Sequence, residues 1–156
     1  MEEMLNEILH LTSKGLQDAK QILKTTKKIK SYIEIEEVEN LIKAVGLRQK
    51  WMEQSDDTKE KINRKLNKIY KKFSIENLDQ IDENRYSVVK EILFNNSQTQ
   101  EIYKRAYELE KQNQIKAKGL LGEYKGRIID IQQGKHAYNT YSRKPTGQSL
   151  LLNEVK

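Results

Sequence analysis

Residues 36–73 read EEVENLIKAVGLRQKWMEQSDDTKEKINRKLNKIYKKF, and this stretch decides the fold of the chain. Its apolar side chains recur three and four positions apart, which is typical of a long α-helix with one buried face. They form two heptad columns: Val38, Val45, Met52, Leu66 and Phe73 in one, and Leu41, Ile62 and Ile69 in the other.

Three polar residues, Arg48, Ser55 and Lys59, interrupt these columns. A polar side chain at a seam position lowers the stability of a coiled coil. The interruptions therefore predict a stretch near mid-helix that is locally open, wet or facing a partner, rather than a uniformly packed coiled coil.

The backbone chemistry allows helix almost everywhere else. Pro145 is the only proline among the 156 residues, so helix can continue to about Tyr141. Before the quoted stretch we expect a helix from about residue 2 to residue 29. Several β-branched residues between positions 25 and 35 favour a kink or short break there, and Ser31-Tyr32-Ile33-Glu34 matches a capping box that restarts a helix.

After the quoted stretch, residues 74–84 (SIENLDQIDEN) are rich in capping and turn residues and predict a reversal of the chain. A third long helix is expected to begin near Arg85. The polar run at residues 95–100 leaves open whether this helix is split in two. Three apolar residues of the reversal are expected to close one end of the core: Ile75, Leu78 and Ile81.

Three glycines lie inside this third periodic region, at Gly119, Gly122 and Gly126. In an exposed helix each glycine costs about 1 kcal/mol relative to alanine. Close approach of another helix and a flexible segment explain the glycines equally well.

The sequence thus predicts an all-α fold: an elongated antiparallel bundle of about three long, coiled-coil-like helices, forming a single domain over residues 1–141. Residues 142–156 (SRKPTGQSLLLNEVK) are expected to be a flexible C-terminal tail, because they contain proline, glycine and serine. The interrupted heptads are compatible with an intramolecular bundle and with a weak pairing of two chains, so a homodimer stays open.

Composition sets the class of protein. Hydrophobic residues make up 36 % of the chain and charged residues 33 %, with no cysteine, which removes disulfides and thiolate chemistry. A mean hydropathy of −0.88 excludes a membrane-spanning helix, and the start Met1-Glu2-Glu3-Met4 lacks the features of a secretory signal. We therefore expect a cytoplasmic protein.

Residues that carry reaction chemistry are scarce. The two histidines, His10 and His136, are isolated and lack the spacing of a ligand set. The chain has neither a glycine-rich phosphate loop nor a Gly-x-Ser-x-Gly nucleophile elbow. The adjacent acids Asp56 and Asp57 point to different sides of a helix. We expect no enzymatic activity, no catalytic or metal-binding residues, no cofactor and no small-molecule substrate.

The net charge of +6 arises mainly from residues 59–72, KEKINRKLNKIYKK, which contain seven basic residues and the single acid Glu60. Apolar residues cover one face of this helix, so an ordinary solvated face is the preferred interpretation. The alternative is a basic coiled-coil module that binds nucleic acid or anionic membrane. The residues expected to form that basic patch are Lys61, Arg64, Lys65 and Lys68.

The end of the chain offers contact residues for a partner. Tyr138 and Tyr141 close the last periodic region, and tyrosine in such a place serves either packing or a protein interface. The adjacent Leu150, Leu151 and Leu152 lie on the predicted tail. Because contiguous exposed apolar side chains usually find a partner, we expect these leucines to contact the bundle itself, a second copy or a client protein.

Two stretches resemble flagellar export chaperones of the FlgN and FliT type. The first is IEIEEVENLIKAVGLRQKWMEQSDD at residues 33–57, where an acidic, apolar-spaced run leads to Leu-Ile and then Arg-Gln. The second is QQGKHAYNTYSRKPTGQSLLLNEVK at residues 132–156, which is similar to the ending of that family. The tail departs from the family in lacking a Phe-Ile-Asp motif, which leaves the client unidentified. The matching family-motif positions are Leu41, Ile42, Arg48 and Gln49, followed by Gly134, Lys135, Ala137, Tyr141 and Leu150 to Leu152.

The resemblance implies a small cytosolic helical bundle that acts as a type III secretion chaperone in flagellum biogenesis. Such a protein binds hook-associated junction proteins or the filament cap and delivers them to the export apparatus. A terminal helix of the client would complete an amphipathic groove of the bundle. Carried over to this chain, the client-binding residues are Tyr138, Tyr141, Leu150, Leu151 and Leu152.

Overall fold

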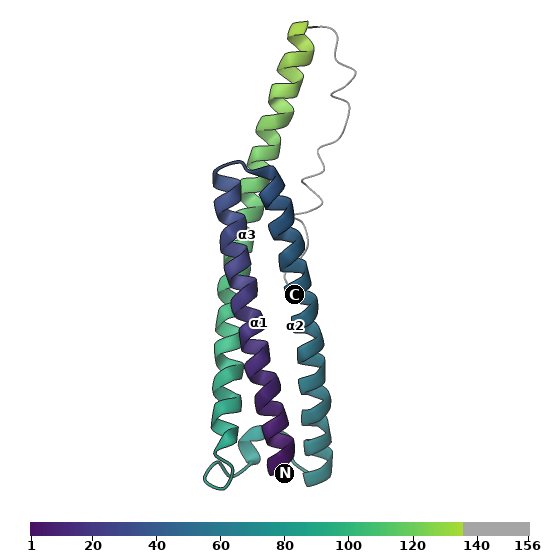
Figure 1. The fold of residues 1–156 in the computed structure, drawn as a ribbon, viewed down its shortest axis with the longest axis vertical. Helices are drawn as coiled ribbons and strands as arrows, with labels where there is room; N and C mark the ends of the chain where they lie inside the picture. Colours follow the sequence, from purple (N-terminus) through teal and green to yellow (C-terminus); the bar gives the residue numbers. More distant parts are fainter. Residues whose placement is uncertain (136–156) are drawn as a thin grey trace. The chain divides into compact units, whose positions relative to one another are not determined.

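The computed structural model describes residues 1–135, and nearly all of them are helical (Figure 1). The long helices are α1 (Glu2–Glu34), α2 (Val38–Phe73) and α3 (Val88–Lys135), with the short 3₁₀ helix η1 (Leu78–Gln80) between α2 and α3. No strand occurs in this part of the chain. The predicted all-α bundle of about three long helices is therefore confirmed, whereas the predicted tail, residues 142–156, lies outside the described residues.

Contacts divide the chain into two compact units, to which each long helix contributes. Unit 1 comprises residues 1–24 and 48–106, and unit 2 comprises residues 25–47 and 107–156. Each unit has an apolar cluster of its own.

In unit 1 the core joins all three helices. Leu5 and Ile8 of α1 pack with Ile69 of α2 and with Val89 and Ile92 of α3. The contact of residue 5 with residue 69 and of residue 18 with residue 58 shows that α1 and α2 run antiparallel here. As predicted, the reversal after α2 closes this cluster, with Leu78 and Ile81 buried and Ile75 packed against them.

In unit 2 the cluster is smaller. Ile29 and Ile33 at the end of α1 pack with Ala44 and Val45 near the start of α2, and with Ala117 of α3. The Asn113 side chain of α3, itself fully buried, donates a hydrogen bond to the Thr26 carbonyl oxygen at 3.2 Å.

The predicted break before α2 is wrong in its position. Residues 31–34 continue α1 instead of capping a new helix, and the Ser31 hydroxyl donates to the Lys27 carbonyl oxygen one turn earlier. The chain reverses at residues 35–37, where Glu36 adopts a left-handed backbone conformation with φ of 56°. The amide of Glu37 bonds to the Tyr32 carbonyl oxygen, which is the pattern of a Schellman helix end.

The end of α2 has the same form. Ser74 has φ of 53°, and the Ile75 amide bonds to the Tyr70 carbonyl oxygen. The polar run at residues 95–100 does not split α3, which is continuous. Asn95 in that run instead donates to the hydroxyl of Thr12 on α1, so part of the run is an inter-helix contact.

Candidate functional site

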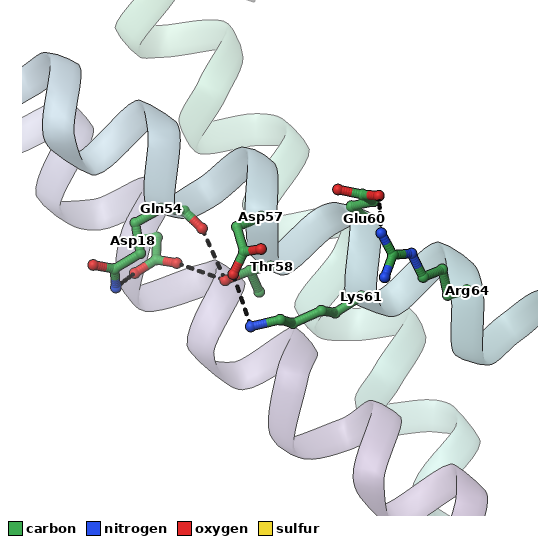
Figure 2. Close-up of polar contacts among 7 residues, drawn as sticks. All are labelled: Asp18, Gln54, Asp57, Thr58, Glu60, Lys61 and Arg64. Atoms are coloured by element: carbon green, nitrogen blue, oxygen red, sulfur yellow. Dashed lines mark hydrogen bonds and ion pairs between the residues drawn. The ribbon is translucent and has the colours of Figure 1, made fainter.

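A buried polar network lies between α1 and α2 in unit 1. The Asp18 carboxylate accepts a hydrogen bond from the Gln54 amide at 2.9 Å (Figure 2). The Thr58 hydroxyl lies 3.2 Å from the other carboxylate oxygen of Asp18 and 3.0 Å from the main-chain carbonyl oxygen of Gln54. Asp18 and Thr58 are buried. The hydrogen bonds that the Asp18 carboxylate accepts offset part of the free-energy cost of burying it in the bundle.

A second polar contact joins α2 to α3 in the same unit. The hydroxyls of Ser55 and Tyr103 are hydrogen-bonded to each other. Burial, followed by the charges of Asp18 and Asp56, raises the pKa of Tyr103 to about 12. Tyr103 therefore stays protonated near neutral pH and does not provide the base that a serine nucleophile needs.

These side chains border a cavity of about 270 Å³ in unit 1. Most of the lining residues carry a hydroxyl or amide group that can bind water or another polar group, but the larger part of the lining surface is apolar. The predicted opening near mid-helix is present here, because Ser55 and Lys59 line this cavity, but Arg48 is buried elsewhere in unit 1. The lining residues are Thr12, Gly15, Ser55, Thr58, Lys59, Ile62, Asn63, Leu66, Asn96, Thr99, Gln100 and Tyr103.

The basic patch predicted as an alternative site is largely paired with acids. Lys61 Nζ lies 2.8 Å from Asp57, Arg64 pairs with Glu60, and Lys65 pairs with Glu7 of α1; Figure 2 shows the first two pairs.

Hydrogen bonds from Lys65 and Lys61 lower the pKa of the Glu7 and Asp57 carboxyls, respectively. Both pairs are solvent-exposed, so they reduce the positive potential of the patch more than they stabilise the fold. Lys68, the fourth predicted member, is exposed.

Unit 2 carries most of the exposed apolar surface. Among the described residues, eight of the nine large exposed hydrophobic side chains belong to it, and Ile115 is the most exposed at 72 %. Phe94, exposed at 62 %, is the ninth and belongs to unit 1. The eight are Ile35, Val38, Ile42, Leu47, Tyr107, Ile115, Ile129 and Ile131.

The family-motif positions are separated by this arrangement. Leu41 packs against the apolar cluster of unit 2, whereas Ile42 is exposed in the same unit. Arg48 is buried in unit 1, and the Gln49 side-chain amide donates to Glu53 at 3.3 Å. The predicted client-binding residues Tyr138, Tyr141, Leu150, Leu151 and Leu152 lie outside the described residues.

Sequence reasoning missed the exposed surface of unit 2. It placed Val38 in the buried seam, yet this side chain is 48 % exposed, because it lies at the first position of α2. For Ile129 and Ile131 the signal is helix length: α3 has 48 residues, whereas α1 has 33 and α2 has 36. The end of α3 therefore outruns the helices that would cover it.

Comparison with known proteins identifies no relative: no family model, curated protein or solved structure matches this chain. Within residues 1–135, no helix combines the length and apolarity required to cross a bilayer. The same residues contain no group of three or more histidine or acidic side chains placed to hold a metal ion.

Proposed function

We propose that this protein is a non-enzymatic chaperone of flagellar type III secretion. It binds hook-associated junction proteins or the filament cap in the cytoplasm and delivers them to the export apparatus. The observation that carries the proposal is the exposed apolar surface of unit 2. Large exposed apolar side chains gathered in one region mark a protein-binding surface, and the resemblance at residues 33–57 and 132–156 supplies the class of client.

The binding mode that fits this surface is an amphipathic client helix laid against helices of the bundle. In the proposal the tail takes part through Tyr138, Tyr141 and the leucines at 150–152. Because apolar contacts dominate such an interface, its affinity depends only modestly on salt.

The second candidate, a polyanion binder working through residues 59–72, has less support. Lys61, Arg64 and Lys65 each have an acidic partner, so fewer charges are available for phosphates. A protein of that kind would lose affinity steeply with increasing salt.

A capture experiment distinguishes the two functions. The full chain and a chain ending at Tyr141 are used as baits in lysate of the source cells at low and high salt, with identification by mass spectrometry. A hook-associated or cap protein that is retained at high salt supports the chaperone function, and its loss on truncation places the contact in the tail. Nucleic acid or lipid released by salt, with no protein client, contradicts it.

A matched pair of variants tests whether unit 2 carries the client site. Ile115→Asp and Phe94→Asp each introduce a charge at an exposed apolar position, one in unit 2 and one in unit 1. We expect Ile115→Asp to weaken binding of the purified client by at least about tenfold and Phe94→Asp to leave it unchanged. Equal effects of the two variants would remove unit 2 as the binding surface.

A further inference from the structure

The cavity of unit 1 has the size of a small-molecule site. Its volume is about 270 Å³, and every residue that lines it belongs to unit 1, with contributions from all three long helices. For comparison, an apolar cavity of about 150 Å³ accommodates one benzene ring. The volume in unit 1 therefore corresponds to a molecule of roughly two fused rings, or to an aliphatic body of similar size.

Gly15 leaves the α1 wall of this cavity open. It is buried, and a Cβ atom added there would lie 3.7 Å from the Thr58 methyl carbon and 4.0 Å from Ile62 Cδ1. Thr58 and Ile62 also line the cavity, so any side chain at position 15 would take up part of its volume. Because glycine has a lower helix propensity than alanine, the open wall lowers the stability of α1.

The walls combine an apolar surface with uncharged hydrogen-bonding groups. The larger part of the lining surface is apolar, and Ile62 and Leu66 are among the residues that line it. Asn96 and Thr99 of α3 also line it and are half-buried, and within residues 1–135 neither side chain has a hydrogen-bond partner. A molecule that matches these walls has an apolar body and a group that donates or accepts hydrogen bonds.

Charges of both signs surround the cavity. Lys59 lines it on the exposed side of α2 and has no acidic partner within the described part of the chain. On the inner side, the buried Asp18 carboxylate is hydrogen-bonded to Thr58. Burial raises the pKa of Tyr103, another lining residue, and the charges of Asp18 and Asp56 raise it further, so their negative potential reaches the cavity. A cation therefore meets Lys59 and an anion meets the two acids, and either ion loses hydration in a mainly apolar space.

We propose that this cavity binds a small uncharged amphipathic molecule, with an apolar body of about two rings and one hydroxyl or amide group. Its apolar body contacts Ile62 and Leu66, and its polar group bonds to Asn96 or Thr99. The sequence does not predict such a site, because the walls come from three helices. The site belongs to unit 1, whereas the proposed client surface belongs to unit 2, so each is tested without the other.

Three fluorescent probes of nearly equal size test the ligand class in the full-length protein at neutral pH. Naphthylmethanol is uncharged, naphthoate is an anion and naphthylmethylamine is a cation. Fluorescence titration and calorimetry should show that naphthylmethanol binds at a single saturable site with a dissociation constant of about 0.1 mM. Each charged probe should bind at least about tenfold more weakly, because its charged group is transferred from water into a mainly apolar cavity.

A matched pair of variants tests whether the probe occupies the cavity. Gly15→Leu fills space beside Thr58 and Ile62, whereas Gly46→Leu adds the same side chain in unit 2, where a Cβ atom meets nothing within 4 Å. Gly15→Leu should weaken naphthylmethanol binding at least about tenfold, and Gly46→Leu should leave it unchanged. Circular dichroism checks the helix content. Should Gly15→Leu lose it, Gly15→Ala, whose Cβ fits at ordinary contact distances, replaces it and should weaken binding about threefold.

Three results would overturn the inference. The first is the absence of saturable naphthylmethanol binding up to about 1 mM, well above the expected dissociation constant. The second is a charged probe that binds as tightly as naphthylmethanol. The third is binding that the substitution at position 15 leaves unchanged, because the probe then occupies another apolar surface, such as that of unit 2.

Discussion

Gly15 in α1 offers a direct measure of how the cavity of unit 1 is built. A Cβ atom added there would lie 3.7 Å from the Thr58 methyl carbon and 4.0 Å from Ile62 Cδ1, which are ordinary contact distances. No described glycine has a positive φ, so alanine fits the helical backbone. Gly15→Ala should gain about 1 kcal/mol of helix propensity and roughly 0.5 kcal/mol from packing the new methyl group, in total about 1.5 kcal/mol.

Gly46→Ala in α2 is the matched control, because a Cβ added there meets nothing within 4 Å. It should gain only the propensity, about 1 kcal/mol at most. Urea unfolding followed by circular dichroism at fixed protein concentration measures both changes. With a slope of about 2 kcal/mol per molar urea, the midpoint for Gly15→Ala should rise by roughly 0.7 M.

A Gly15→Ala protein that is less stable than the unmodified chain would refute this reasoning, provided that Gly46→Ala is stabilised. That outcome would mean that the wall of the cavity cannot accept one methyl group. Equal stabilisation of the two variants would mean that the methyl at position 15 finds no packing, so that the neighbouring side chains of α2 stand further away.

Three further outcomes are expected. Asp18→Ala should lower the free energy of unfolding by about 2 kcal/mol in urea titrations, because it leaves the buried Thr58 hydroxyl without the Asp18 acceptor and removes the hydrogen bond from the exposed Gln54, and Asp18→Asn should lose less. Lys65 lowers the pKa of Glu7 below 4.5. The pair therefore stabilises the fold at pH values above the pKa of the unfolded state, and this stabilisation is lost as the pH falls through the pKa of the folded state. In Lys65→Gln, the pKa of Glu7 measured by NMR should move up towards 4.5. The pKa of Tyr103 is raised to about 12, so its contribution to stability is complete below about pH 10 and is lost as pH rises through 12. Absorbance at 295 nm should show the last tyrosine ionisation of the native protein, and Tyr103→Phe should remove it.

The apolar period predicts the helices because it reports directly which face each one buries. It does not locate the turn between α1 and α2. Helix ends of the Schellman type usually carry glycine at the left-handed position, whereas this chain uses Glu36 and Ser74 there. Residues 35–37 contain no glycine or proline that would mark the turn. The capping-box pattern at residues 31–34 therefore predicts the start of the second helix at the wrong position.

The site is less predictable than the fold for a physical reason. A polar residue in a heptad column shows that the seam is interrupted, but its partner comes from elsewhere in the chain. Ser55 is bonded to Tyr103, which is 48 positions away and on another helix. Likewise, the apolar pattern of Ile128 and Ile131 resembles a core stripe, yet within residues 1–135 Ile128 is only half-buried and Ile131 is exposed, because α3 is longer than α1 and α2.

The two units depart from the hydrophobic pattern in opposite directions, and both departures lower stability. Unit 1 buries Asp18 and Thr58, which contribute less than apolar residues of the same volume would. Unit 2 leaves Ile115 and Ile129 in water, where each forfeits on the order of 1 kcal/mol of burial. A sequence optimised only for stability would have polar side chains at the exposed positions of unit 2. Since local departures of this kind concentrate at functional sites, the surface of unit 2 is where a partner of this protein should be sought.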